Sequence, residues 1–404
     1  MILVVGKYHS SIIDYFESQK MNYFVLKDKQ YYTEEDGHSK LVDFRDQAAV
    51  QRACEELPEK PSCIFAMYEQ YIPTAAELNV KFNLAGLTPE VARICTDKNL
   101  MRAKLSEASR KISPAFRPVD NEQDLLDFAK EYGYPVFLKP ANLSKSLLIS
   151  RCDNEIELLA AYRKAVKFAE ELYSRQTLNL RPRFIVEQFL EGTMHTVMTF
   201  SDKSGGVMVF PHIVDVVTAK QMGHDDTFLY ARITPSPLPQ ATQKELLDCA
   251  KLAVETLELR SCPGHVELML TEEGPMIIEV GARLGGYRSR MYQYVSGRNI
   301  VGMAMDSYRG VLPEPASTEV SEHSISVELF PETDGVMREI TNLDELKALK
   351  SLTYLGLKSK PGDKIGKASH GYKAVAVIIL RHADRQRVEA DYQFITDRVK
   401  VLAD

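Results

Sequence analysis

The chain has 404 residues, which is too long for one hydrophobic core and predicts two to four domains. Its 45% apolar and 26% charged residues are typical of a folded globular protein and exclude a disordered one. Fifty Lys and Arg against 56 Asp and Glu give a net charge of −6, so no overall basic field favours nucleic acid or an anionic membrane as a partner.

Apolar runs are short throughout the chain. The run before Gly6 is too short for a signal-peptide core, and the longest later run, residues 374–380, is far below a membrane span. We therefore expect a cytoplasmic protein. The cysteines form no CxxC pair and have no histidine at zinc-ligand spacing, so we expect six reduced, buried thiols: Cys54, Cys63, Cys95, Cys152, Cys249 and Cys262.

The first ninety residues alternate between strand-like and helix-like segments. The expected strands are residues 1–5, 22–27 and 63–68, and the expected helices are residues 11–20 and 47–57. Such alternation predicts a parallel sheet with covering helices. No GxGxxG follows the first strand, and "GKYHS" lacks the leading glycine of a P-loop. A turn glycine and a surface lysine are therefore favoured over a phosphate role for Lys7.

The remaining chain divides into three further segments. Residues 91–182 predict helices at 97–109, 122–132 and 153–175 and strands at 115–119, 135–141 and 146–152. A strand-rich region follows at 183–310, with one clear helix at 244–258. A final segment at 311–404 mixes strands and glycine-rich turns. With the alternating domain at 1–90, this predicts an α/β and α+β protein of four parts.

A hairpin signal at residues 264–286 places two acids opposite each other. If residues 271–275 form a five-residue loop, Glu267 lies directly opposite Glu279. Alternation then gives an apolar opposite face: Val266, Leu268, Leu270, Met276, Ile278 and Val280. Like charges across a ladder destabilise it, so we expect a positive group between them. A hard divalent cation is one candidate. Solvated acids, or an acid paired with Arg283, remain the alternative.

Two lysines also need anionic partners. Lys139 ends the strand-like run 136–139, and a buried ammonium requires a partner charge, of which phosphate is one. Lys98 stands at the start of a predicted helix, where the helix dipole disfavours a cation unless it reaches an anion. A solvated lysine remains the alternative reading for Lys98.

The four residues that follow the strand-like run 183–186 are suited to hold a planar base. In this interpretation the backbone amide and carbonyl groups of these four residues face the edge of the base, and the Glu187 carboxylate accepts a hydrogen bond from an exocyclic amine of the base. The stretch consists of Glu187, Gln188, Phe189 and Leu190. The alternative is an ordinary hairpin turn closed at residues 191–192.

Taken in order, these lysines, the Glu-x-x-Leu stretch and the Glu…Glu-x-x-x-Arg hairpin resemble the ATP-grasp superfamily from about residue 84 to 310. Within it, "EVGARLGG" at residues 279–286 resembles carboxylate–amine ligases of the L-amino acid ligase kind. The resemblance implies an ATP-grasp fold with a Rossmann-like N-terminal domain at 1–90, two ATP-grasp subdomains at 91–182 and 183–310, and a small C-terminal α+β segment at 311–404.

The resemblance also implies residue roles. Lys98 and Lys139 contact ATP phosphates, residues 187–190 hold adenine, and Glu267 and Glu279 ligate Mg²⁺, with Mn²⁺ as an alternative. Arg283 lies against the γ-phosphate and the developing acyl phosphate. The implied reaction joins a small-molecule carboxylate and amine through an acyl phosphate, with no nucleic acid or membrane partner. Many relatives are dimers, so a homodimer is compatible with the resemblance.

Three departures from the family pattern accompany the match. The phosphate-covering loop at 141–146 has no glycine, and Ser144 and Ser146 are expected to donate to phosphate in its place. Met194 stands where relatives place a ribose-binding Glu, and His195 is expected to substitute. Gly281 stands where many relatives carry Asn.

The acceptor substrate is the least constrained part. His212, Arg288 and Arg290 are expected to line its pocket, because an amino acid carboxylate favours an arginine. A satisfied core histidine and two surface arginines are the alternatives. Two other functions remain open: an acyl-phosphate enzyme of the bicarbonate-dependent carboxylase type, and an ATP-binding module without catalysis.

Overall fold

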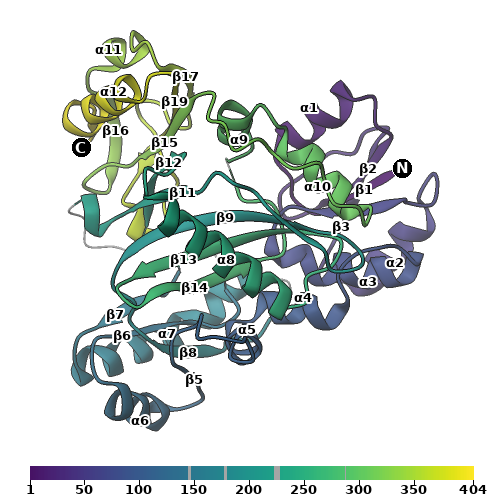
Figure 1. Ribbon diagram of the computed structural model, residues 1–404, viewed down its shortest axis with the longest axis horizontal. Coiled ribbons are helices and arrows are strands. Elements are labelled where there is room, and N and C mark those ends of the chain that lie inside the picture. Colours follow the sequence, from purple (N-terminus) through teal and green to yellow (C-terminus); the bar gives the residue numbers. More distant parts are fainter. Residues whose placement is uncertain (144–146, 177–179, 223–227, 287) are drawn as a thin grey trace.

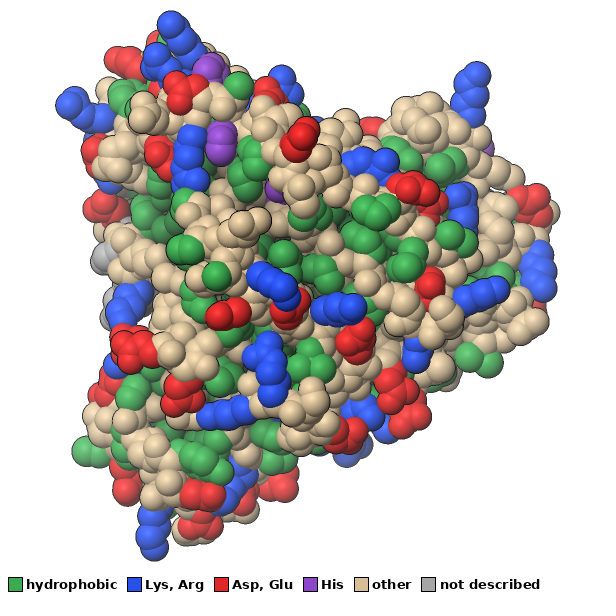
Figure 2. Space-filling view, in the orientation of Figure 1, with side chains coloured by type: hydrophobic (Ala, Val, Ile, Leu, Met, Phe, Trp, Pro, Cys, Tyr) green, Lys and Arg blue, Asp and Glu red, His purple; other side chains and the backbone are tan. Residues whose placement is uncertain are grey.

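The computed structural model describes residues 1–143, 147–176, 180–222, 228–286 and 288–404 (Figure 1). Within these ranges the strands form four sheets, two of four strands, one of three and one of nine. On the face shown in Figure 2, basic and acidic side chains are intermixed. No helix in the described ranges has the length and apolar character needed to cross a bilayer.

The N-terminal domain contains a parallel sheet, as the alternation predicts. Its order is β3-β2-β1-β4, formed by Ser39–Val42, Tyr23–Asp28, Ile2–Val5 and Cys63–Ala66. Its helices are α1 (Ser10–Ser18), α2 (Gln47–Glu55), α3 (Ile72–Phe82) and α4 (Pro89–Thr96), with a 3₁₀ turn, η1, at Glu69–Tyr71. Strand β3 was not predicted, because a four-residue run that includes Ser39 and Lys40 carries little strand signal.

A small antiparallel sheet follows, with the order β5-β8-β6-β7. Its strands are Phe116–Val119, Phe184–Gln188, Val136–Pro140 and Ser150–Cys152, and its helices are α5 (Lys98–Leu105), α6 (Glu122–Tyr132) and α7 (Glu155–Gln176). The strand expected at 146–152 is shorter, since β7 begins at residue 150. The side chain of Asp97 accepts hydrogen bonds from the amides of Asn99 and Leu100, which starts α5 at Lys98.

The large sheet has the order β14-β13-β9-β11-β12-β15-β19-β17, with β10 paired to β9. Its first strands are β9 (Thr193–Ser201), β10 (Val207–Val209), β11 (Val214–Thr218), β12 (Leu229–Thr234), β13 (Pro263–Thr271) and β14 (Gly274–Gly281). Strands β15 (His323–Leu329), β17 (Leu352–Leu357) and β19 (Ala376–His382) extend it. The sheet therefore crosses the expected boundary at residue 310, and the four-part division remains a prediction.

Helices and a second small sheet complete the C-terminal half. Helix α8 (Gln240–Thr256) lies across the large sheet in Figure 1, and η2 (Lys220–Met222) follows β11. Helices α9 (Arg288–Ser296) and α10 (Ile300–Tyr308) lead toward the C-terminal strands. The three-stranded sheet has the order β18-β16-β20, formed by Lys364–Ile365, Gly335–Ile340 and Val401–Ala403. It is accompanied by α11 (Leu343–Lys347), η3 (Ala368–His370) and α12 (Arg385–Arg398).

Among the residues that the structure describes, the buried apolar side chains group into three cores rather than four. One core joins the N-terminal domain to strands β9, β13 and β14 and helix α8. The small sheet with α6 and α7 has its own core, and the C-terminal elements have another. The N-terminal domain is thus packed firmly on the large sheet, and the small sheet is the more separate unit.

The segment after β8 is a link between two sheets. Strand β8 pairs with β5 and β6 in the small sheet, whereas β9 pairs with β11, β13 and β10 in the large sheet. The alternative, an ordinary hairpin turn closed at residues 191–192, is therefore wrong.

The buried Arg102 on α5 ties the two sheets together. Its Nε and one terminal nitrogen donate to the Glu187 carboxylate of β8 at 2.9 and 3.3 Å, and the same terminal nitrogen donates to the Ile278 carbonyl of β14 at 2.7 Å. Only 1% of the side chain is exposed. Because a guanidinium presents its donors in a rigid fork, one residue can hold both strands in a fixed relation.

We expect Arg102→Met to lower the free energy of unfolding by about 3–5 kcal/mol, because it leaves a buried carboxylate and a carbonyl without this donor. Urea denaturation followed by circular dichroism measures the change. Arg93→Met on the exposed face of α4 is the matched control, with an expected change within about 0.5 kcal/mol. Equal stability of the two variants would contradict the role given to Arg102.

Candidate active site

The two acids of the hairpin face each other across β13 and β14, as predicted. Glu267 is the register partner of Glu279. The expected five-residue loop is wrong, however. Thr271 pairs with Gly274, so the loop has two residues, and a β-bulge at Ile278 supplies the odd residue that brings the acids opposite each other.

The bulge also changes which side chains share the apolar face. Leu268 pairs with Ile277, and Met269 with Met276. The apolar face therefore carries Ile277, which is fully buried, and the expectation that Met276 and Ile278 lie on it is corrected. The bulge leaves the Ile278 carbonyl to accept from Arg102. The bulge thus brings the two acids opposite each other and also frees the carbonyl through which Arg102 links the two sheets.

Lys98 reaches the acid pair from the start of α5. Its Nζ lies 3.3 Å from Glu279 Oε1 and donates to the Leu143 carbonyl at 3.1 Å. Only 8% of Lys98 is exposed, so the solvated-lysine alternative is wrong. Burial opposes the charge, but Glu279 and Glu69 hold the Lys98 pKa above its usual value.

Lys139 is buried beside Glu187. Its Nζ lies 2.6 Å from Glu187 Oε2, and 4% of the lysine is exposed. Burial lowers the pKa of Lys139, and the neighbouring Arg102 and Lys98 lower it further, whereas Glu187 raises it. Burial opposes ionisation of Glu187, yet Arg102 and Lys139 hold its pKa at about 2. The Glu187 carboxylate is therefore ionised, and both of its oxygens already bind Lys139 and Arg102. Its expected contact with adenine remains a prediction.

Arg283 follows β14 and pairs with an acid from the N-terminal domain. Its terminal nitrogen lies 3.0 Å from Oε1 of Glu69 in η1. Burial opposes the charge, but Glu69, Glu267 and Glu279 raise the pKa of Arg283. Lys98, Lys139 and Arg283 likewise hold the Glu279 pKa below its usual value against the effect of burial. Cations and carboxylates from distant parts of the chain thus form one charged centre.

Two members of this centre were missed from the sequence. Glu69 is 214 positions away from Arg283, and nothing local distinguishes it from a surface acid. Arg102 had a usable signal, because it lies four residues after Lys98 and so on the same face of α5.

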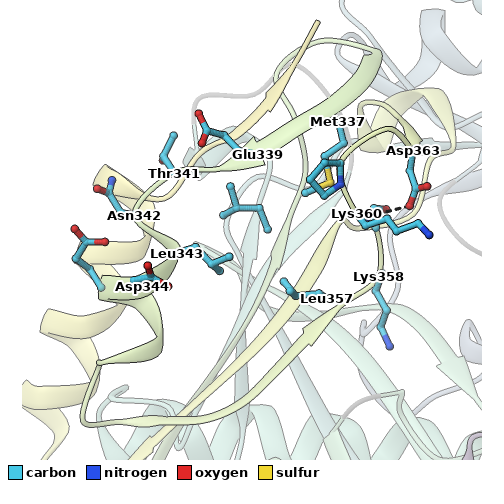
Figure 3. A pocket seen from close by; sticks show the side chains of 14 residues that line it. Met337, Glu339, Thr341, Asn342, Leu343, Asp344, Leu357, Lys358, Lys360 and Asp363 are labelled. Carbon is cyan, nitrogen blue, oxygen red and sulfur yellow. Dashed lines mark hydrogen bonds between the residues drawn. The ribbon is translucent and has the colours of Figure 1, made fainter.

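A cavity of about 310 Å³ opens onto this centre. Glu69, Lys98 and Glu279 line it together with residues of α2, α3 and the stretch 142–143. A second cavity, about 930 Å³, lies away from the centre in the C-terminal region. Figure 3 shows Glu339, Asn342 and Asp344 on one side of it and Lys358 and Lys360 on the other. None of the predicted site residues lines this second cavity.

The stretch expected to hold adenine lies at the link between the sheets. The Gln188 amide donates to the Ala115 carbonyl at 3.0 Å. The Phe189 ring packs against Phe137 and lies 4.6 Å from the Arg151 guanidinium. The side chain of Phe189 is thus used in packing, and backbone contacts of residues 188–190 with a base remain a prediction. Ser144 and Ser146 lie outside the described residues.

The expected ribose contact by His195 is wrong. His195 pairs with Leu268, whereas Met194 pairs with Met269 on the same face as Glu267. Strand alternation therefore directs His195 to the face opposite the acid pair. There it is 3% exposed and contacts Thr193 Oγ1 at 2.7 Å and Asp215 Oδ1 at 2.8 Å.

The three residues expected around the acceptor have different environments. His212 is buried, and its Nε2 lies 2.9 Å from the Ser317 carbonyl, which favours the core-histidine alternative. Burial lowers the pKa of His212. Arg290 is exposed, and its guanidinium lies 4.7 Å from the centre of the Tyr354 ring. The backbone of Arg288 begins α9, and its side chain is outside the described set.

Comparison with known proteins agrees with this geometry. Residues 132–290 match the ATP-grasp domain, and residues 328–402 match the L-amino acid ligase C-terminal domain 2. The chain is 26% identical over 305 residues to alanine–anticapsin ligase of Bacillus subtilis, a match that covers 69% of this chain and 61% of that protein. The first curated relatives are matched over 59% to 61% of their length, so this chain spans about three fifths of them.

Two solved structures share the fold along the whole chain. The L-amino acid ligase from Bacillus licheniformis has a TM-score of 0.82 at 20% identity and covers 100% of this chain and 98% of its own. The N5-carboxyaminoimidazole ribonucleotide synthetase from Thermotoga maritima has a TM-score of 0.71 at 16% identity, with 100% and 99% covered. The predicted ATP-grasp fold is thus confirmed, and two segments of the chain match the ATP-grasp domain and the L-amino acid ligase C-terminal domain 2.

Proposed function

We propose that this protein is an ATP-dependent carboxylate–amine ligase that forms an amide or peptide bond through an acyl phosphate, with an amino acid as one substrate. The observation that carries the proposal is the charged centre in which Lys98 contacts Glu279 of the acid pair, while Lys139 and Arg283 lie within range of its charge. Similarity to alanine–anticapsin ligase supports an amino acid as the substrate class.

Phosphoryl transfer needs positioning and charge neutralisation, and this centre can supply both. In the proposed first step a substrate carboxylate oxygen attacks the γ-phosphorus of ATP, and the bond to the β-phosphate oxygen breaks to release ADP. Lys98 and Lys139 neutralise phosphate oxygens. Arg283 faces the transferred group, and Glu69 orients the guanidinium through the contact at 3.0 Å.

In the proposed second step the amine attacks the acyl carbon of the acyl phosphate. The amide bond forms, the carbon–oxygen bond to phosphate breaks, and the amine loses a proton as inorganic phosphate leaves. The guanidinium of Arg283 stabilises negative charge at both stages, because its pKa is held high by the surrounding carboxylates.

The acid pair fits magnesium. In the described residues no three His, Cys, Asp or Glu side chains gather at a metal-binding spacing, so the protein supplies two carboxylates, Glu267 and Glu279. Magnesium typically binds one or two carboxylates together with substrate phosphates, which matches this donor set. When bound, the ion would neutralise phosphate charge, and Mn²⁺ offers the same chemistry.

We further propose a cytoplasmic location and small-molecule carboxylate and amine substrates. All six cysteines are free and buried, which is consistent with a reducing compartment. The homodimer remains a prediction.

Purified protein with ATP and Mg²⁺ should release ADP and phosphate only when a carboxylate and an amine substrate are both present. A panel of amino acids and carboxylic acids, scored for ADP and for the amide product, makes the measurement, and removal of Mg²⁺ by EDTA should stop release. No ADP across the panel would contradict the proposal. Release that depends on bicarbonate would favour the carboxylase alternative, and a raised melting temperature with ATP but no turnover would favour a binding module.

Glu279→Gln and Arg283→Ala should each lower kcat by about 100-fold or more, because the first removes a carboxylate that would hold Mg²⁺ and the second removes positive charge that faces the transferred phosphoryl group. Steady-state ADP release makes the measurement, and circular dichroism checks that the variants are folded. Glu273→Gln in the exposed loop of the same hairpin is the matched control and should retain wild-type kcat. Unchanged turnover in Glu279→Gln would exclude the acid pair from catalysis.

A further inference from the structure

A largely buried ion pair lies on the large sheet, away from the acid pair and outside the charged centre. Arg232 of β12 donates from one terminal nitrogen to Glu328 Oε1 of β15 at 2.9 Å. Only 14% of the arginine side chain and 11% of the glutamate side chain are exposed. Because the desolvation of two charges offsets most of their attraction, stability alone does not account for this pair.

Strand register places Arg232 on the same face of the sheet as the acid pair. Glu267 pairs with Thr196 of β9, and Thr196 pairs with Val214 of β11. Two residues further along β11, Val216 shares this face and pairs with Arg232. Three steps between neighbouring strands, each about 4.8 Å, put the backbone of Arg232 roughly 14 Å from that of Glu267 across the sheet. A small substrate that reacts beside the acid pair can therefore extend toward Arg232.

The guanidinium of Arg232 is oriented with one edge available. Both of its hydrogen bonds to described residues come from the same terminal nitrogen, which also donates to the Leu229 carbonyl at 3.0 Å. Within the described ranges, Nε and the other terminal nitrogen have no protein acceptor. These two groups form the fork that binds a carboxylate through two parallel hydrogen bonds. A guanidinium held in this way is suited to a carboxylate ligand.

A buried hydroxyl beside Arg232 also lacks a partner. Ser326 of β15 is the register partner of Arg232 and so lies on its face. Only 1% of Ser326 is exposed, and its Oγ has no hydrogen-bond partner in the part of the chain that the structure describes. Ser324, two residues earlier on the same face, donates to the Leu380 carbonyl at 2.9 Å. Because an unsatisfied buried hydroxyl costs free energy, Ser326 is explained by a polar ligand at Arg232 rather than by packing.

Arg232 lies nearer to the acid pair than Arg290, the arginine expected at the acceptor. Ser326 pairs with Ile379 of β19, and Ile379 pairs with Tyr354 of β17. The Arg290 guanidinium lies over Tyr354, 4.7 Å from the centre of the ring. Arg290 is therefore at the outer edge of the same face, three strands beyond β12. Of the two arginines, Arg232 is the better placed to contact a substrate that reacts beside the acid pair.

We propose that Arg232 binds the α-carboxylate of the amino acid whose amine attacks the acyl phosphate. This inference rests on the proposed ligase function and narrows the acceptor to amino acids with a free carboxylate, which excludes simple amines and amino acid amides. The fork of Arg232 donates two hydrogen bonds to the carboxylate, and the Ser326 hydroxyl donates a third. Glu328 keeps the guanidinium in place. The product is then a peptide with a free carboxyl end.

Acid and amide forms of the same amino acid test the inference by binding. Isothermal titration calorimetry in the presence of ADP and Mg²⁺ compares L-alanine with L-alaninamide and L-phenylalanine with L-phenylalaninamide. In at least one pair the acid should bind about ten-fold more tightly or better. Arg232→Met should remove this preference. A carboxylate that is bound only where the acyl phosphate forms would keep its preference in this variant.

Two further variants separate ligand binding from a structural role. Arg232→Lys keeps a positive charge beside Glu328, which protects the fold, but it lacks the fork and should also lower the preference. Glu328→Gln removes the ion pair but still offers an oxygen to the Arg232 guanidinium, so the preference should remain. A merely structural ion pair would make Arg232→Met and Glu328→Gln behave alike.

Arg117→Met is the matched control, because it removes an ion pair with Glu131 at 3.0 Å in the small sheet, and it should leave the preference unchanged. No preference for the acid in either pair of ligands, a preference that survives in Arg232→Met, or an equal loss in Arg232→Met and Glu328→Gln would overturn the inference. Because the readout is binding, a failure here is distinguishable from a failure of ADP release.

Discussion

The structure depends on the need to balance two carboxylates that strand pairing forces together. Glu267 and Glu279 are register partners in a largely buried sheet, an arrangement that destabilises the protein unless positive charge compensates it. Lys98 contacts Glu279 directly, and Lys139 and Arg283 add their charge from further away. Lys98 and Lys139 are buried and Arg283 is half-buried, so each charge would be costly alone. The charges are therefore stable only as a group, which makes the site a property of the assembled fold.

A helix cap, a β-bulge and an ion pair between domains bring these charges together. Capping by Asp97 starts α5 so that Lys98 reaches the acids, and four residues later Arg102 joins β8 to the bulge in β14. The bulge sets the acids opposite each other in spite of a two-residue loop. The N-terminal domain then contributes Glu69, which holds Arg283. Cations supplied by the elements of both sheets, one of them paired with an acid of the N-terminal domain, suit the proposed reaction, in which positioning and neutralised charge supply most of the catalysis.

The parts that could be predicted were those with a local signal. Periodicity identified many of the strands and helices in the first 190 residues, the hairpin and helix α8. Lys139 and the acid pair were recognised because charge interrupts apolar runs there, Lys98 because it starts a helix, and Arg283 through the family resemblance. The bulge was missed because a two-residue loop plus a bulge and a five-residue loop both bring Glu267 opposite Glu279. That error misassigned the face of Ile278. The face of His195 was misjudged because its position was taken from the family pattern without regard to alternation in β9. Glu69 could not be identified from the sequence, because only the tertiary fold brings it to Arg283.

The central claim is that a carboxylate is activated as an acyl phosphate before the amine attacks. The most direct measurement uses a carboxylate substrate with both oxygens labelled with ¹⁸O, followed by mass spectrometry of the products after turnover with unlabelled ATP. If the acyl phosphate forms, each inorganic phosphate released carries one ¹⁸O atom and the amide retains the other. Phosphate free of label, or label transferred to AMP, would contradict this mechanism.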